Sequence, residues 1–124
     1  MATEPRKKHW LFFTTRSPWT SSNAAACVDM VMTAAIFDQK VNLVFCNDGV
    51  YQLLNGQNGS AYGMKTLAQQ LPAMELYGVE QIFVEQSALT ERGLQERDLI
   101  QAVTLLSYAQ MQTLIAESNA VLVF

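Results

Sequence analysis

The stretch Val41–Leu54 has the sequence Val-Asn-Leu-Val-Phe-Cys-Asn-Asp-Gly-Val-Tyr-Gln-Leu-Leu. Its first part, Val41–Cys46, is a mostly apolar run typical of a buried β-strand. The residues Asn47-Asp48-Gly49 are typical of a tight turn, and Val50–Leu54 predicts a short apolar helix directly after it. A strand that passes through a turn straight into a helix indicates an α/β fold.

The same kinds of segment alternate along the rest of the chain. Further strands are predicted at His9–Thr14, Val79–Glu85, Ala102–Leu106 and Ala120–Phe124. Strands that alternate with helices at this spacing call for right-handed crossovers, and so predict a mainly parallel sheet of about five strands with helices on both faces. We expect a single-domain three-layer α/β sandwich over residues 9–124, preceded by an N-terminal extension of residues 1–8.

Four helices are predicted from composition and end signals. The first spans Asn23–Asp38, with Ser22 or Asn23 as N-cap, and the second spans Met64–Tyr77, with Leu67, Leu71 and Met74 on one face. The third is short, Ser87–Arg92. The fourth spans Tyr108–Ser118, with Ser107 as N-cap and with Met111, Leu114 and Ile115 pointing inward. Gly78 and Gly93 are placed to end two of these helices. Pro72 is expected to kink or divide the second helix. The glycine-rich stretch Asn55–Gly63 predicts a surface loop.

Composition excludes several classes of protein. The chain has 124 residues, of which 50% are hydrophobic and 15% charged, so a disordered or linker-like character is excluded. The formal net charge of −3 argues against direct binding of nucleic acid, which needs a concentrated basic face. The longest apolar runs reach about five residues, far below the about twenty that a membrane span requires. We therefore expect no membrane partner.

Cysteine and histidine are too scarce for several kinds of active site. The only cysteines are Cys27 and Cys46, and His9 is the only histidine. No CxxC or HExxH motif occurs, so neither a protein-built zinc site nor a Ser-His-Asp triad is expected. The absence of GxGxxG and Walker motifs leaves no support for a nucleotide cofactor. Two free thiols are typical of a reducing compartment, which predicts a cytoplasmic protein without metal or cofactor.

The segment Asn23–Asp38 is apolar nearly all round. Between Ala24 and Asp38 only Asp29, Thr33 and Asp38 are polar. One face can lie on the sheet, but so small a domain leaves little to cover the other face, which predicts a subunit interface. The alternative is that the alanines are simply good helix formers with small exposed areas.

Ligands of open α/β sheets collect at the C-terminal ends of the strands. At the end of the second strand, Cys46 is a candidate thiol because the turn amides after it could lower its pKa. The alternative is a buried cysteine that packs as a small apolar residue. Asp48-Gly49 could orient a ligand beside a backbone anion site, or could simply form the turn.

The loops after the other strands supply further candidates for a pocket or an interface. Arg16 could attract a persulfide, a phosphate or a partner's carboxylate, or could be a solvated loop arginine. Trp19, in the same loop, is a candidate interface anchor. Glu85 ends the third predicted strand at the ligand edge. Arg92 could line a subunit contact or form a charge pair at a helix end.

Three stretches together resemble the TusC/DsrF branch of the DsrE/F-like sulfur-relay proteins. Asp48–Leu54 matches the branch's Asp-Gly-Val-aromatic-Gln-Leu-Leu pattern throughout. A later stretch runs from Tyr77–Gln81 through Leu89–Leu94, where the branch's Leu-Arg-Glu-Arg-Gly-Leu pattern is matched except that Thr90 stands in place of the first arginine. Val121–Phe124 resembles the family's closing strand. The resemblance covers roughly residues 9–124.

The resemblance implies a subunit of a cytoplasmic complex of three related chains, with two copies of each. The partners would be TusB- and TusD-like or DsrE- and DsrH-like subunits, and a downstream protein would accept the sulfur. In the catalytic relative the relay cysteine follows the third strand. The matching region here, Phe83–Ser87, contains no cysteine. Because a persulfide carrier needs a thiolate, the chain resembles a non-catalytic partner, which could also self-associate when alone.

The destination of the sulfur stays open at this point. In the Tus branch it reaches 2-thiouridine of tRNA, which the TusC-like match favours, and in the Dsr branch it enters sulfur oxidation. Two other functions are also open. One is a stand-alone thiol sulfurtransferase that uses Cys46. The other is a small-ligand-binding module that uses the Thr14–Ser22 and Asp48–Gly49 loops.

Overall fold

The computed structural model describes residues 8–17, 22–37, 39–54, 67–79, 81–100 and 103–124. Its centre is one five-stranded sheet with the order β4-β3-β2-β1-β5, in which all neighbouring strands are parallel. The strands are β1 (His9–Thr14), β2 (Lys40–Phe45), β3 (Gln81–Glu85), β4 (Thr104–Leu106) and β5 (Ala120–Val123). The predicted mainly parallel five-stranded sheet is confirmed.

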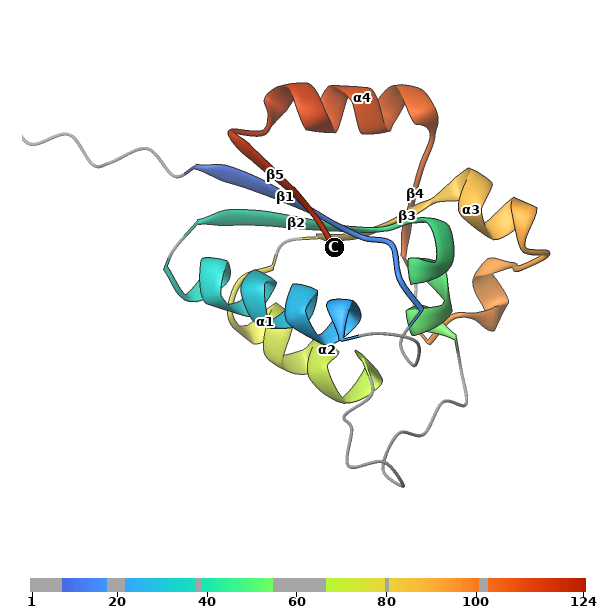
Figure 1. Ribbon diagram of the computed structural model, residues 1–124, viewed down its shortest axis with the longest axis horizontal. Helices are drawn as coiled ribbons and strands as arrows, with labels where there is room; N and C mark the ends of the chain where they lie inside the picture. Colours follow the sequence, from blue (N-terminus) through green and yellow to red (C-terminus); the bar gives the residue numbers. More distant parts are fainter. Residues whose placement is uncertain (1–7, 18–21, 38, 55–66, 80, 101–102) are drawn as a thin grey trace, which may run out of the picture.

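Helices cover both faces of this sheet, which confirms the α/β sandwich (Figure 1). On one face lie α1 (Asn23–Ile36) and α2 (Leu67–Leu76), and on the other lies α4 (Tyr108–Glu117). The short α3 (Gln86–Glu91) follows β3 directly, and the 3-10 helix η1 (Asn47–Leu53) follows β2. A second 3-10 turn, η3 (Glu96–Asp98), occupies the link before β4. Within the described residues, every helix is too short or too polar to cross a bilayer.

Most differences from the predicted elements lie at their ends. The apolar helix expected at Val50–Leu54 is a 3-10 helix that begins at once after Cys46. Ser22 is the N-cap of α1, but its side chain makes no capping hydrogen bond. α2 continues through Pro72 as one helix, so Pro72 does not divide it, one of the two expected effects. Ile115 was expected inward but is 42% exposed. Asn55–Gly63 lies outside the described residues.

Two glycines end helices as predicted. Gly78 (φ +96°) and Gly93 (φ +67°) take backbone conformations that residues with a Cβ rarely adopt. After α2, the amides of Gly78 and Val79 donate to the carbonyls of Glu75 and Met74, both at 3.1 Å. The same pattern follows α3, so both helices end in a Schellman motif. α4 begins with Ser107, whose hydroxyl accepts from the Gln110 amide in a capping box.

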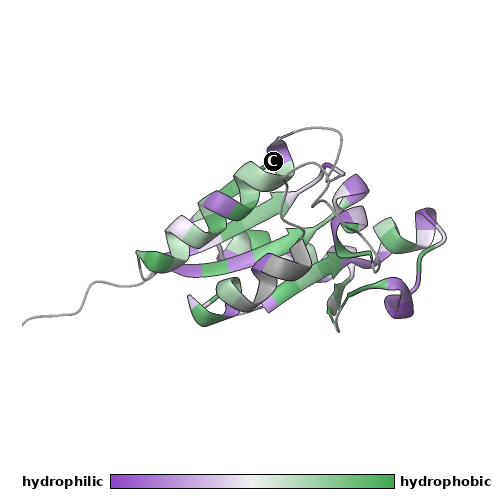
Figure 2. Ribbon diagram, turned by 90° about the horizontal axis from the view of Figure 1, so that it is seen from below, coloured by the Kyte–Doolittle hydropathy of each residue, from purple (hydrophilic) through white to green (hydrophobic). Residues whose placement is uncertain are grey.

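The hydrophobic core is larger on one face of the sheet than on the other. Between the sheet and helices α1 and α2 lies the larger cluster, which includes the fully buried Phe12, Leu43 and Phe45. The strands are hydrophobic over most of their length, as Figure 2 shows. On the α4 face a smaller cluster surrounds Leu11 and Val44. No residue of α4 is buried, so this helix leaves much of its own surface and of β5 uncovered.

Candidate functional site

The loop after β2 is held tightly against the end of β1. The Cys46 amide donates to the Thr14 carbonyl (3.1 Å), and Asn47 adopts a positive φ of 48°. A Cβ on Gly49 would lie 2.7 Å from the carbonyl carbon of Thr14 and closer still to its oxygen. Close packing therefore requires glycine at position 49. This favours the interpretation that Asp48-Gly49 forms the turn at the start of η1 over the interpretation that it orients a ligand.

Two of the predicted site residues meet beside this turn. Arg92, at the end of α3, donates from Nε (3.2 Å) and Nη2 (3.0 Å) to one carboxylate oxygen of Asp48. Its Nη1 donates to the Ala88 carbonyl (3.1 Å) and lies 3.7 Å from a Glu91 oxygen. The Arg92 side chain is 19% exposed, whereas that of Asp48 is 61% exposed. Arg92 thus forms a charge pair that fixes α3 to η1.

A pocket of about 510 Å³ lies next to this pair, at the C-terminal ends of β3 and β4. Its lining residues come from the ends of β3 and β4, from α3 and from the start of α4: Glu85, Gln86, Ser87, Thr90, Glu91, Leu106, Ser107 and Tyr108. Among the described residues, no lysine or arginine lines this pocket. It therefore offers carboxylates, hydroxyls and one buried leucine to a ligand.

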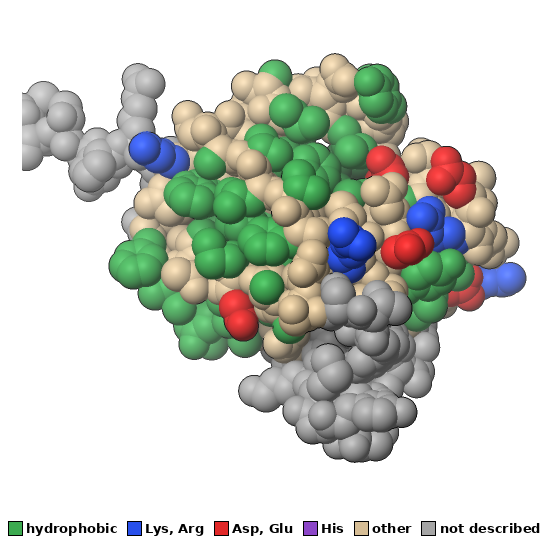
Figure 3. Space-filling view, viewed as in Figure 1, with side chains coloured by type: hydrophobic (Ala, Val, Ile, Leu, Met, Phe, Trp, Pro, Cys, Tyr) green, Lys and Arg blue, Asp and Glu red, His purple; other side chains and the backbone are tan. Residues whose placement is uncertain are grey.

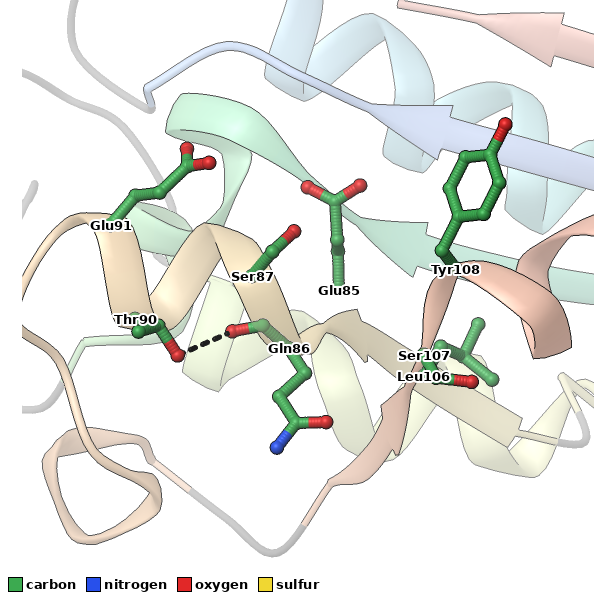
Figure 4. A pocket seen from close by; sticks show the side chains of 8 residues that line it. All are labelled: Glu85, Gln86, Ser87, Thr90, Glu91, Leu106, Ser107 and Tyr108. Atoms are coloured by element: carbon green, nitrogen blue, oxygen red, sulfur yellow. Dashed lines mark hydrogen bonds between the residues drawn. The ribbon is translucent and has the colours of Figure 1, made fainter.

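Glu85 stands at the centre of this pocket (Figure 4). Its carboxylate lies between Ser87 on α3 and Tyr108 on α4, and points to the same side as the Ser87 hydroxyl and the Tyr108 ring. The Thr90 hydroxyl is directed away and donates to the Gln86 carbonyl (3.2 Å). The pocket was predicted only through Glu85. The contribution of Ser107 and Tyr108 was missed because it depends on β4 lying beside β3.

Both thiols are buried. Cys46 is 6% exposed and donates to the Thr14 carbonyl (3.8 Å). The pKa of the Cys46 thiol is raised to about 12, mainly by burial and also by the negative charge of Glu85, while the charge of Arg92 acts in the opposite direction. Burial likewise raises the pKa of Cys27, which is 1% exposed, to about 12. Its burial and raised pKa favour the alternative of a packed cysteine over a thiolate activated by the turn amides.

Gln52 is a buried polar residue that sequence reasoning did not single out as a site residue. Its side-chain amide donates to the Thr14 hydroxyl (2.7 Å) and to the Arg16 carbonyl (2.9 Å). Gln52 is 5% exposed, so these bonds are shielded from water. They fix the backbone of the loop after β1, while the Arg16 side chain is exposed. Trp19 lies outside the described residues.

The surface also carries an exposed hydrophobic area, away from the pocket around Glu85. On the face shown in Figure 3, hydrophobic side chains gather over β5, α1 and α4. We call the exposed hydrophobic residues of these elements, with the C-cap of α1, the apolar patch: Met30, Ile36, Phe37, Ile115, Val121 and Val123. A hollow of about 410 Å³ in this patch is lined in part by Trp10, Met30 and Phe37. Part of the second face of α1 is thus left uncovered by the rest of the chain, as expected from the sequence, and the subunit interface on it stays a prediction.

Among the described residues, no group of three or more His, Cys, Asp and Glu side chains is arranged to hold a metal ion. The described residues that line the pocket include no cysteine and no histidine. Of the described lining residues, Glu85 and Glu91 are the ones that could act as a general acid or base, and none is an activated nucleophile for covalent catalysis. The arrangement is suited to binding through charge and hydrogen bonds.

A family model described as the DsrE/DsrF-like family matches residues 8–124. A Pseudomonas aeruginosa protein named as a TusC homolog is 31% identical over 112 residues, which cover 90% of this chain and 94% of the relative. A Vibrio vulnificus TusC homolog is 34% identical and covers 87% of this chain and 92% of its own length.

Two further comparisons extend this picture. The intracellular sulfur oxidation protein DsrF of Allochromatium vinosum is 30% identical, with 94% of this chain and 96% of that protein covered. Among solved structures, the ychN protein of E. coli has the same fold, with a TM-score of 0.80 at 16% identity. That match covers 96% of this chain and all of the other.

Proposed function

Because the chain belongs to the DsrE/DsrF-like family, we propose that it is a non-catalytic subunit of a sulfur-relay complex. The carrying observation is the lack of an available thiol at the ligand edge of the sheet. The turn from β3 into α3 is Glu85-Gln86-Ser87, and the two cysteines of the chain are buried with raised pKa values. A relay cysteine must be a thiolate that its donor can reach, so another subunit supplies it.

The apolar patch supports a role in assembly. An exposed face of this kind is a common feature of subunit surfaces, and β5 is an edge strand without charge, proline or bulge to discourage pairing. The proposed partners are two homologous subunits, TusB- and TusD-like or DsrE- and DsrH-like, in a heterohexamer, with a separate downstream sulfur acceptor. We place this complex in the cytoplasm, without direct contact to nucleic acid or membrane.

Within this proposal, the sulfur is destined for 2-thiouridine of tRNA, as in the TusC branch. The two TusC homologs of 31% and 34% identity support this destination. The alternative destination is a sulfur oxidation pathway, which the 30% identity to DsrF supports. We also propose that residues 9–124 form the whole interacting domain and residues 1–8 an extension.

Co-expression with its two homologous subunits tests the assembly. A stable complex of fixed stoichiometry, measured by size-exclusion chromatography with light scattering, is expected. A chain that stays apart from both subunits would contradict the proposal.

A persulfide donor tests the non-catalytic role. Intact-mass spectrometry of this chain after incubation should show no added sulfur, while the thiol-bearing subunit gains one under the same conditions. Sulfur on Cys46, lost in Cys46→Ser, would instead establish the chain as a sulfurtransferase in its own right.

A further inference from the structure

We propose that the pocket around Glu85 binds a cationic side chain, the ammonium of a lysine or the guanidinium of an arginine, presented by a protein partner. The inference goes beyond the proposed function, since it concerns what this pocket recognises and not whether sulfur passes through the complex.

The first reason is a carboxylate in the pocket without a counter-ion. Glu85 is half-buried at the end of β3, and within the described part of the chain no ion pair reaches it. The nearby cation, Arg92, is already engaged by Asp48 and by the Ala88 carbonyl. A half-buried carboxylate gains more from a cation than an exposed one does, because water screens the pair less.

The second reason is the set of neutral groups around that carboxylate. The Ser87 hydroxyl lies on the same side of the pocket and can accept a hydrogen bond from an N–H donor. The Tyr108 ring stands on the other side and is 78% exposed, so its face is open to a cation. Leu106, which is 6% exposed, gives the pocket an apolar wall for the methylene stem of lysine or arginine.

The third reason is the sign of the charge. Glu85 and Glu91 line the pocket, and no basic residue does in the part of the chain that the structure describes. A phosphate, a thiolate or a persulfide anion would be repelled by both carboxylates and would meet no compensating cation among the described lining residues. The pocket therefore selects against the anionic sulfur species of a relay and in favour of a basic side chain.

A protein is the source that fits the rim of the pocket. A large exposed aromatic residue such as Tyr108 is typical of residues that anchor protein interfaces. An exposed tyrosine beside an unpaired carboxylate offers a partner one apolar contact and one charged contact at the same place.

Two-dimensional amide NMR of the full-length chain tests the inference with defined probes. The probes are Nα-acetyl-arginine methylamide and Nα-acetyl-lysine methylamide, with the glutamine and glutamate analogues as neutral and anionic controls. Saturable shifts are expected with the basic probes at residues 85–91 and 106–108, and not with the controls. Glu85→Gln should weaken binding about tenfold, or about 1.4 kcal/mol.

Glu117→Gln is the matched control, since Glu117 is an exposed carboxylate at the opposite end of α4. It should leave the affinity unchanged. If Glu85→Gln disturbs the fold, which the same spectra reveal, Tyr108→Ala serves in its place and should also weaken binding. Equal shifts with the glutamine analogue, no shifts in the pocket with either basic probe, or unchanged affinity in both pocket variants would overturn the inference. None of these outcomes bears on assembly with the homologous subunits.

Discussion

Arg92 donates two hydrogen bonds to the same carboxylate oxygen of Asp48, a residue 44 positions earlier in the chain. The pair joins the end of α3 to the first turn of η1, and so connects the segments that follow β3 and β2. The pair also engages two nitrogens of the Arg92 guanidinium, and the third nitrogen is bound to the Ala88 carbonyl. The pocket keeps its negative charge as a result.

The stability provided by this pair is expected to be small. Asp48 is 61% exposed, and exposed ion pairs contribute at most about 1 kcal/mol. Asp48→Asn should therefore lower the free energy of unfolding by less than about 1 kcal/mol, as measured by urea denaturation. Asp29→Asn, at an exposed position on α1, is the control. A loss several times larger would mean that the pair supports more of the fold than its exposure indicates.

Gln52 should contribute more, although it carries no charge. Gln52→Ala removes one buried and one partly buried hydrogen bond, and leaves the Thr14 hydroxyl and the Arg16 carbonyl without this donor. We expect a loss of about 2 kcal/mol in the free energy of unfolding. Gln112→Ala, at an exposed position on α4, should change it by less than about 0.5 kcal/mol. Equal effects of the two substitutions would show that the buried amide does not hold the loop.

Gly49 is expected to tolerate no side chain. In Gly49→Ala the new methyl group would overlap the Thr14 carbonyl, so β1 and η1 would have to separate. A loss of about 3 kcal/mol or more is expected, at the upper end of the cost of overpacking. Gly93→Ala is the contrasting control, since its Cβ meets nothing within 4 Å and only its φ of +67° is unfavourable, at a cost of about 1–2 kcal/mol. Thermal unfolding of both variants distinguishes steric overlap from backbone strain.

These contacts show which parts of the molecule the sequence could predict. The strands were located because apolar runs and turn residues are local signals. Gly78 and Gly93 were assigned as helix ends for the same reason. The Asp48–Arg92 pair and the Gln52 bonds join residues far apart in the chain, and no local pattern encodes such distances. The prediction for Ile115 was wrong because the helical period indicates which side of α4 faces the sheet, but not how far the contact between α4 and the sheet extends.

The two buried thiols predict a pH dependence of stability. Each has a pKa of about 12 in the folded chain, against 9.0 for an exposed thiol. Above pH 9 the unfolded chain loses protons that the folded chain keeps, so stability falls as pH rises from 9 toward 12, and below 9 the thiols have no effect. The slope is at most about 1.4 kcal/mol per pH unit for each thiol.

Urea denaturation across this alkaline range measures the effect. The double variant Cys27→Ala/Cys46→Ala should lose less stability than the natural chain between about pH 8 and about pH 10.5. Parallel curves for the two proteins would mean that the thiols titrate alike in the folded and unfolded states.

The exposure of the apolar patch leads to a prediction about assembly. Val123 is 68% exposed on the edge strand β5, so an aspartate there meets water in the free chain and costs little stability. In a complex that covers the patch, the same carboxylate would be buried without a partner, which is strongly unfavourable. Val123→Asp should therefore abolish co-purification with the homologous subunits while the melting temperature of the isolated chain stays nearly unchanged. Gln112→Asp adds the same charge to exposed α4 and should assemble normally. Normal assembly of Val123→Asp would show that β5 is not part of the interface, and would leave the α1 side of the patch as the candidate.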